Sequence, residues 1–223
     1  MNAKLFFQAL IKFILGIVLV GVLIFLPSGS LYFINGWILM GVLFVPMLLA
    51  GIVMMINNPE LLKKRLNAKE KQKEQSLVVK LSGLMFLAGF IVAGLGYRFE
   101  WYILPRFVSI IGAVLFLLAY VLYAIVLKTN TYLSRTIEVQ ENQKVIDTGV
   151  YGVVRHPMYS ATLLLFLAMP IILGSVFALG IFLAYPFIIA ARIKHEEAFL
   201  VEELEGYAEY KKKVKYRLVP FVW

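Results

Sequence analysis

The chain has 223 residues, of which 61% are hydrophobic and only 16% charged, whereas a soluble domain carries about 25% charged residues. Its mean hydropathy is +0.85 and its net charge is +9. The absence of cysteine excludes disulfides, thiolate metal sites and a cysteine nucleophile. This composition predicts an all-α integral membrane protein.

Long apolar runs come first in the chain, and each reaches the roughly 20 residues that cross a bilayer. They are Leu5–Leu26, Leu31–Ile56, Leu77–Tyr97 and Ile103–Leu127. Two shorter runs follow, Met158–Leu173 and Val176–Ala191, separated by Gly174-Ser175. We therefore expect about six transmembrane helices, the last two forming a short helical hairpin, and a cytoplasmic C-terminal helix that begins at Glu196. The first run is too long for a cleaved signal peptide and predicts a membrane span.

Basic residues are distributed unevenly around these runs. With the N-terminus in the cytoplasm, 20 of the 22 Lys and Arg residues fall on inner segments, and the outer loops hold only Arg98 and Arg106. The positive-inside rule then places both termini in the cytoplasm, and we expect the cell membrane as the location. Because the basic residues flank membrane spans, membrane lipids are the expected partners and nucleic acid is not.

The two halves of the chain differ in polarity. Residues 1–128 are expected to form a four-helix membrane scaffold within one structural domain. In this half, Asn58–Gln75 predicts an interfacial or solvated helix, and Gly94-Leu95-Gly96 lacks the strand of a dinucleotide motif, which favours helix packing. In residues 129–223, the polar stretch Asn130–Tyr159 is longer than a connection requires, and its alternation at residues 136–140 indicates order.

The first polar cluster is the run Asp147–Tyr159, which contains one of the two histidines. The residue before a proline favours extended geometry, so His156 is expected at the turn that enters the fifth span, with Pro157 at its first helical position. Backbone amides at a helix N-terminus favour a negative ligand group, with Arg155 or His156 beside it. The alternative is that Arg155 pairs with lipid headgroups and His156 only caps the helix.

The second polar cluster, Arg192–Glu197, contains the other histidine, His195. Arg192 and Glu196 are four residues apart and share a helix face, so Glu196 can face a pocket while Glu197, about 100° around, faces another partner. A buried carboxylate at a membrane boundary requires a cation, which is either a positively charged ligand or an ordinary arginine partner. The histidines and Glu196 lack tight ligand spacing, so no metal is expected.

Together the two clusters resemble the isoprenylcysteine carboxyl methyltransferase family and its wider phospholipid methyltransferase relatives. The matching pieces are Thr148-Gly149-Val150-Tyr151, Arg155-His156-Pro157-Met158-Tyr159, Arg192-x3-Glu196-Glu197, Gly206-x3-Tyr210 and Arg217-Leu218-Val219-Pro220. Their order and spacing match jointly, whereas the first four spans match in hydropathy only. The Arg-His-Pro-x-Tyr element by itself also occurs in membrane sterol and steroid reductases.

The resemblance implies an S-adenosylmethionine pocket in residues 129–223, which makes this the cofactor-binding catalytic half, and a lipophilic acceptor that enters from the bilayer. The cofactor-binding positions that it implies are Gln140, Gln143, Lys144, Val145, Ile146, Tyr151, His156, Pro157, Met158, Tyr159, Glu196 and Glu197. Arg192 would bind the acceptor, and Arg192 and Glu196 are the expected catalytic residues. One departure is that the family's histidine before the Gly-x-Tyr segment is replaced here by Gln143 or Lys144.

Methyl transfer from a sulfonium depends on positioning more than on acid–base catalysis, so no metal is required. The chain has no obvious strong general base, which suits an acceptor that is already nucleophilic, either a carboxylate or a neutral lipid amine. The enzyme alternative is an NADPH-dependent reductase of an isoprenoid or steroid-like substrate. A membrane scaffold or transporter-like protein is the non-enzyme alternative, but it predicts ionisable residues around a midplane cavity. The Glu196-Glu197 pair and the lack of a basic pocket for a 2′-phosphate favour the methyltransferase.

Overall fold

The computed structural model describes residues 3–66, 73–133 and 139–223, and within these ranges it confirms the all-α prediction. The first half comprises α1 (Ala3–Ser28), α2 (Ile34–Asn57), α3 (Pro59–Leu66), α4 (Lys73–Arg98) and α5 (Arg106–Thr129). A long connection carries the single 3-10 turn η1 (Gly149–Gly152), and it leads to α6 (Pro157–Leu173), α7 (Val176–Phe182), α8 (Tyr185–Glu203) and α9 (Tyr207–Lys213).

The predicted spans are present as helices. In the described ranges, 5 segments are long and apolar enough to cross a membrane: Ala3–Ser28, Ile34–Asn57, Ser76–Arg98, Arg106–Thr129 and Val176–Glu203. The sixth, α6, is a shorter apolar helix that closes the hairpin with α7, and Gly174 ends it in the left-handed conformation, with φ +72°. Each long helix can satisfy its backbone groups internally, as a bilayer requires.

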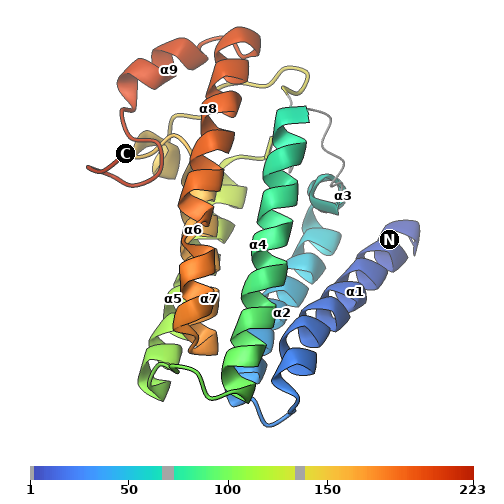
Figure 1. Cartoon of the computed structure of the whole chain (residues 1–223). Helices are drawn as coiled ribbons and strands as arrows, with labels where there is room; N and C mark the ends of the chain where they lie inside the picture. The colour runs from blue at the N-terminus through green and yellow to red at the C-terminus, as the bar shows by residue number, and fades with distance from the viewer. Residues whose placement is uncertain (1–2, 67–72, 134–138) are drawn as a thin grey trace.

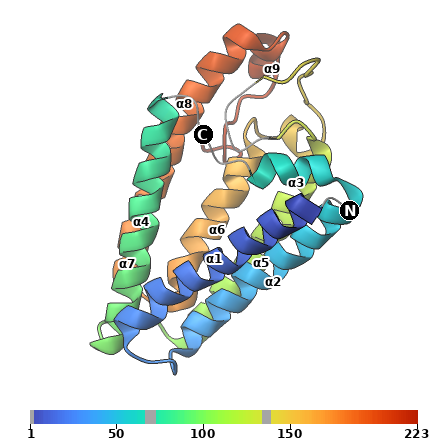
Figure 2. The ribbon, with the colours of Figure 1, turned by 90° about the vertical axis from the view of Figure 1, so that its right-hand side faces the viewer.

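The helices form two groups with α6 between them. On one side α4 lies along α7 and α8, as both views show (Figures 1 and 2), and on the other side α1 and α2 run together beside α5 (Figure 2). The short α3 crosses the end of α2 close to the N-terminus of α1 (Figure 2). Helix α9 lies at one end of the molecule, and α3 and the N-terminus lie closer to its middle (Figures 1 and 2).

The two groups approach most closely toward the opposite end, where glycines allow contact between helix backbones. A Cβ atom on Gly94 of α4 would lie 2.5 Å from the carbonyl oxygen of Ile24 in α1, so only glycine fits there. A Cβ atom on Gly112 of α5 would lie 2.9 Å from Ile171 of α6. These contacts confirm a packing role for the Gly94 region and hold the helices together at one end.

The returning arm of the hairpin differs from the single run predicted for Val176–Ala191. Helix α7 ends at Phe182 and α8 begins at Tyr185, because Pro186 lacks the amide hydrogen needed to continue the helix from the preceding turn. Beyond this break α8 continues without interruption to Glu203. The tail, expected to begin as a helix at Glu196, continues α8 without a break, so Arg192 and Glu196 belong to the same helix as the returning span.

The C-terminal helix is α9, and it is separated from α8 by Gly206 at φ +81°. Its residues Tyr207, Tyr210 and Val214 pack with Leu204 in a second small core. Within the expected helix over Asn58–Gln75, α3 covers Pro59–Leu66 and α4 begins at Lys73, while residues 67–72 lie outside the described part of the chain. Most of the alternating segment at 136–140 also lies outside it.

Candidate functional site

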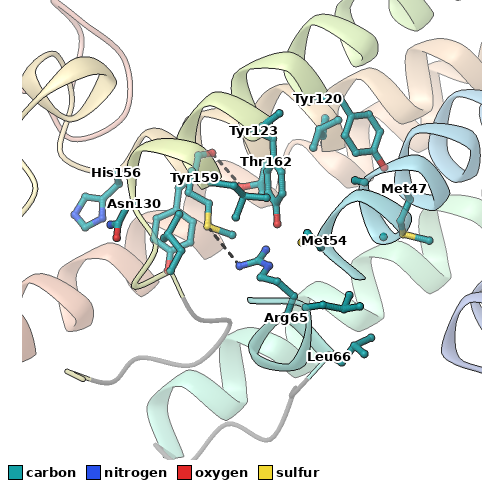
Figure 3. Close-up of a pocket in the computed structure, with 18 of the residues that line it drawn as sticks. Met47, Met54, Arg65, Leu66, Tyr120, Tyr123, Asn130, His156, Tyr159 and Thr162 are labelled. Atoms are coloured by element: carbon teal, nitrogen blue, oxygen red, sulfur yellow. Dashed lines mark hydrogen bonds between the residues drawn. The ribbon is translucent and has the colours of Figure 1, made fainter. Parts of the chain in front are cut away.

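A cavity of about 1520 Å³ lies between the two groups of helices and extends to α3, η1 and α9 (Figure 3). Most of its wall is apolar and comes from α1, α2, α4 and α5, including Phe13, Met47, Met54 and Phe116. Polar side chains gather at one end, on η1, α6 and α8. The shape suits a ligand with a polar head and a long apolar body.

The Arg-His-Pro turn is built as the sequence predicts. His156 occupies the N-cap of α6 and Pro157 is the first helical residue, although the His156 backbone, with φ −124° and ψ 60°, is not fully extended as expected. The turn is fixed from outside by the C-terminal segment, because the backbone amides of Arg155 and His156 donate to the carbonyls of Tyr216 and Arg217, each at 2.9 Å. This segment therefore positions the turn that forms part of the cavity wall.

Glu197 is the centre of a buried ionic cluster. Its Oε1 accepts hydrogen bonds from Arg155 Nε at 2.7 Å and lies 3.3 Å from His156 Nε2, while its Oε2 accepts from Arg217 Nε at 3.1 Å. The ammonium of Lys211 is 3.6 Å from the same Oε2. Arg155 also donates from Nη1 to the Val214 and Lys215 carbonyls. The cluster ties the Arg-His-Pro turn and α8 to the C-terminal segment, and it places Arg155 with a protein carboxylate instead of lipid headgroups.

Glu196 faces the cavity, one residue earlier in the same helix. Its Oε2 accepts a hydrogen bond of 2.5 Å from the Tyr159 hydroxyl, which itself accepts one of 2.8 Å from Arg192 Nε. The other carboxylate oxygen, Oε1, is 4.0 Å from His156 Nδ1. A chain of polar groups thus runs along the wall from Glu196 through Tyr159 to Arg192, next to Thr162 and Tyr185 where the apolar part begins.

Tyr151 of η1 forms another part of the polar wall. Its hydroxyl accepts a hydrogen bond from Asn130 Nδ2 at 3.1 Å, and its carbonyl accepts one from the Tyr210 hydroxyl at 2.8 Å. Burial raises the pKa of Tyr151 to about 12. The phenol therefore stays protonated near neutral pH and serves as a hydrogen-bonding and stacking group, not as a base.

Most of the predicted site residues line this cavity together. Those on its wall are Gln143, Lys144, Val145, Ile146, Tyr151, His156, Met158, Tyr159, Arg192 and Glu196. Three others are placed elsewhere: Gln140 bonds to Lys64 and the Tyr132 carbonyl, Pro157 is fully buried, and Glu197 is held in its ionic cluster. His195 is exposed on α8, and the described residues contain no group of three side chains suited to a metal.

Two side chains on the wall were missed by the sequence reasoning. Arg65 reaches the cavity from α3, in the half expected to be scaffold. Tyr207 of α9 lines the cavity too, and in the described part of the chain its hydroxyl is a buried side-chain group without a hydrogen-bond partner. The sequence spacing could have indicated that Arg65 faces the interior, because Leu62, Arg65 and Leu66 share a helix face and the two leucines are apolar.

Comparisons with known proteins agree with this geometry. Residues 107–206, just under half of the chain, match the family described as phospholipid methyltransferase. A solved structure of a eukaryotic intramembrane Ras methyltransferase, the isoprenylcysteine carboxyl methyltransferase, is similar with a TM-score of 0.54 and 21% sequence identity. The alignment covers 92% of this chain and 74% of that one, which shows a shared fold. No curated protein sequence matches the chain.

The helical membrane fold and the family match together define a membrane methyltransferase that uses S-adenosylmethionine. The match to the phospholipid methyltransferase family is confined to residues 107–206. The matched region starts in α5 and ends after α8, so it includes the Arg-His-Pro turn, the hairpin and the Arg192–Glu197 segment. The family resemblance expected from the sequence is confirmed.

Proposed function

We propose that this enzyme transfers a methyl group to the carboxylate of a lipophilic acceptor, in the cavity and at the cytoplasmic boundary of the membrane. The observation that carries the proposal is the position of Arg192 and Glu196. Both contact the Tyr159 hydroxyl in the cavity wall, at 2.8 and 2.5 Å, where the polar lining meets the apolar lining. One carboxylate and one guanidinium at this junction suit a cationic cofactor and an anionic acceptor.

The polar end of the cavity suits S-adenosylmethionine. The cofactor has an ammonium and ribose hydroxyls that can donate to Glu196, whose side chain is one-fifth exposed toward the cavity. Its planar base fits beside apolar and aromatic side chains such as Val145, Ile146, Leu200 and Tyr151. The buried, unpartnered hydroxyl of Tyr207 is one more group that a polar ligand could satisfy. When bound, the cofactor supplies an activated methyl group.

The residues of the chain then have separate tasks. Glu196 and the wall formed by residues 143–146 bind and orient the cofactor, and the aromatic rings of Tyr151 and Tyr159 exclude water from the polar end. Arg192 holds the acceptor carboxylate in its ionised, nucleophilic form, which a low-dielectric cavity otherwise disfavours. No proton has to be removed from a carboxylate, so neither Glu196 nor His156 on the wall has to act as a base.

A carboxylate is favoured over a lipid amine by the charge at the junction. The cavity wall there presents the Arg192 guanidinium, and a protonated amine would be repelled by it and would lack a lone pair for the methyl group. The solved relative is described as acting on isoprenylcysteine carboxyl groups. We therefore infer that the acceptor here combines a carboxylate with a long apolar chain, which fills the part of the cavity lined by α1, α2 and α4.

The basic residues of α3 and α9 support the cytoplasmic location of the site. Lys63, Lys64 and Arg65 end α3, and Lys211, Lys212 and Lys213 end α9, on the side of the molecule that holds the polar part of the cavity (Figure 1). The positive-inside rule assigns this side to the cytoplasm, where the water-soluble cofactor is available.

The proposal is tested with detergent-purified protein and S-adenosylmethionine that carries a labelled methyl group. Three acceptors are compared: an S-prenylcysteine, a long-chain fatty acid and phosphatidylethanolamine. We expect label in a base-labile methyl ester of one or both acids. Label in the phospholipid alone contradicts the carboxylate assignment, and NADPH-dependent reduction of a prenyl chain without methyl transfer contradicts the reaction class.

The role of Glu196 is tested by calorimetric titration with S-adenosylhomocysteine. Glu196→Gln should weaken binding by about tenfold or more, because a charge-assisted hydrogen bond is lost. Glu202→Gln, an exposed position on the same helix, is the matched control and should bind normally. Equal affinities of the two variants would show that Glu196 does not hold the cofactor.

A further inference from the structure

Arg65 places a positive charge in the cavity from an element outside the matched family region. Helix α3 presents Leu62, Arg65 and Leu66 to the cavity on one face, whereas Lys63 is exposed. The position of α3 is fixed at both ends of the helix. The Leu61 amide donates to Asn58 Oδ1 at 3.1 Å, and the Leu66 carbonyl accepts from Lys12 Nζ at 2.6 Å. The orientation of Arg65 therefore follows from how α3 is held.

The Arg65 guanidinium lies among aromatic and sulfur-containing side chains. Its Nη1 is 3.9 Å from Met158 Sδ, and its Cζ lies 5.4 Å from the centre of the Tyr123 ring. Figure 3 shows the Arg65 side chain extending from its helix toward the cavity, with a dashed line for its contact with the methionine sulfur. An arginine inside a mostly apolar cavity of a membrane protein is costly and is usually retained for a functional reason.

Arg65 and Arg192 approach the same turn of α6. Met158 and Tyr159 are consecutive residues there, and the first contacts Arg65 while the second contacts Arg192. One arginine comes from α3 and the other from α8, so the two charges reach the same turn of α6 from the two halves of the chain. A guanidinium matches the planar geometry of a carboxylate, and two of them can bind its two oxygens separately.

We propose that Arg65 is a second acceptor-binding residue, which together with Arg192 binds the carboxylate of the lipophilic acceptor and makes α3 an element of acceptor selection. This inference rests on the proposed function. It also accounts for product release, because methylation removes the negative charge that both arginines bind. The neutral ester then keeps only its apolar contacts and can return to the bilayer.

The test compares Arg65→Gln with Lys63→Gln, which removes the same charge from the exposed face of the same helix. We expect Arg65→Gln to raise KM for the carboxylate acceptor about tenfold or more, with S-adenosylhomocysteine affinity unchanged, because one charge-assisted contact is lost. Inhibition by the product methyl ester should stay the same. Arg65→Lys should recover part of the loss, since it keeps the charge but not the planar fork.

The outcomes separate the two proposals. If the wild type binds S-adenosylhomocysteine but methylates no carboxylate, the proposed function fails. If the wild type is active and both glutamine variants have its KM, only the role of Arg65 fails. A parallel loss of cofactor affinity in Arg65→Gln and Arg65→Lys would show that the residue supports the fold of the site instead. Size-exclusion profiles in detergent identify a misfolded variant, and Arg65→Lys then carries the test.

Discussion

Glu196 and Glu197 are adjacent in α8 but serve different structures. The carboxylate of Glu196 lies on the cavity wall and accepts from Tyr159, whereas that of Glu197 is 2% exposed and accepts from Arg155 and Arg217. The rotation of about 100° per residue in a helix separates the two directions. One acidic pair thus supplies a cavity-facing group and a structural group that fixes the Arg-His-Pro turn behind it.

The two glutamates should respond differently to substitution. Glu197→Ala leaves Arg155 buried without its carboxylate, and we expect it to lower the free energy of unfolding by about 3–5 kcal/mol. Glu196→Ala should change stability by less than about 1 kcal/mol but abolish cofactor binding. Chemical unfolding in detergent and titration with S-adenosylhomocysteine measure the two effects. Equal stability losses would contradict the separation of roles.

The unpartnered hydroxyl of Tyr207 predicts an unusual stabilising substitution. A buried polar group without a partner costs about 1–3 kcal/mol, so Tyr207→Phe should raise the free energy of unfolding of the ligand-free protein by about 1 kcal/mol. Tyr210→Phe is the matched control, since its hydroxyl donates to the Tyr151 carbonyl and its removal should destabilise by about 1 kcal/mol. Destabilisation by both would show that the Tyr207 hydroxyl has a partner in solution.

The close contact at Gly94 predicts that even a methyl group is harmful there. Gly94→Ala places its Cβ against the backbone of α1, so we expect a loss of about 1–3 kcal/mol in the free energy of unfolding. Gly41→Ala, with open space around its Cβ position, should instead stabilise α2 by about 0.5–1 kcal/mol. Thermal unfolding in detergent compares them, and a neutral Gly94→Ala would contradict the tight crossing.

The ion pair between Asp147 and Lys213 predicts a small pH effect. The hydrogen bond and charge of Lys213, 2.7 Å away, lower the pKa of the Asp147 carboxyl in the folded protein. Stabilisation from a lowered pKa is present above the ordinary value and is lost as the pH falls through the folded value. Asp147→Asn should therefore have a lower free energy of unfolding than the wild type near pH 7, and the difference should disappear as the pH falls below about 4. Lys213→Met should behave in the same way, and a difference that persists in acid would argue against the pair.

The spans and the Arg-His-Pro turn could be predicted from the sequence because each depends on local chemistry. Apolar length determines a membrane helix, and the geometry of a residue before proline determines the place of His156. The break before α8 is also present in the sequence, as Pro186. It was not predicted, because one proline removes only one hydrogen bond and hardly changes the hydropathy of a run of 16 residues.

The tertiary part of the site could not be predicted in the same way. Arg65 lies 93 residues before Met158, and in sequence it belongs to a run of lysines that suggests a solvated helix. Only the position of α3 across the end of α2 brings it to the cavity. Likewise, the choice between Glu196 and Glu197 as the cavity-facing residue depends on where Arg155 and Arg217 lie, and neither is near them in sequence.

The glycine contacts at Gly94 and Gly112 hold neighbouring helices together at one end of the molecule. From the Gly94 contact α1 and α4 diverge, so a small change in the angle between them produces a larger displacement at their far ends, which border the apolar part of the cavity. The angle between α1 and α4 therefore sets the width of the apolar part of the cavity, whereas the polar wall is held by hydrogen bonds from the C-terminal segment. Such an enzyme is expected to tolerate tails of different length and branching while it discriminates strictly between head groups.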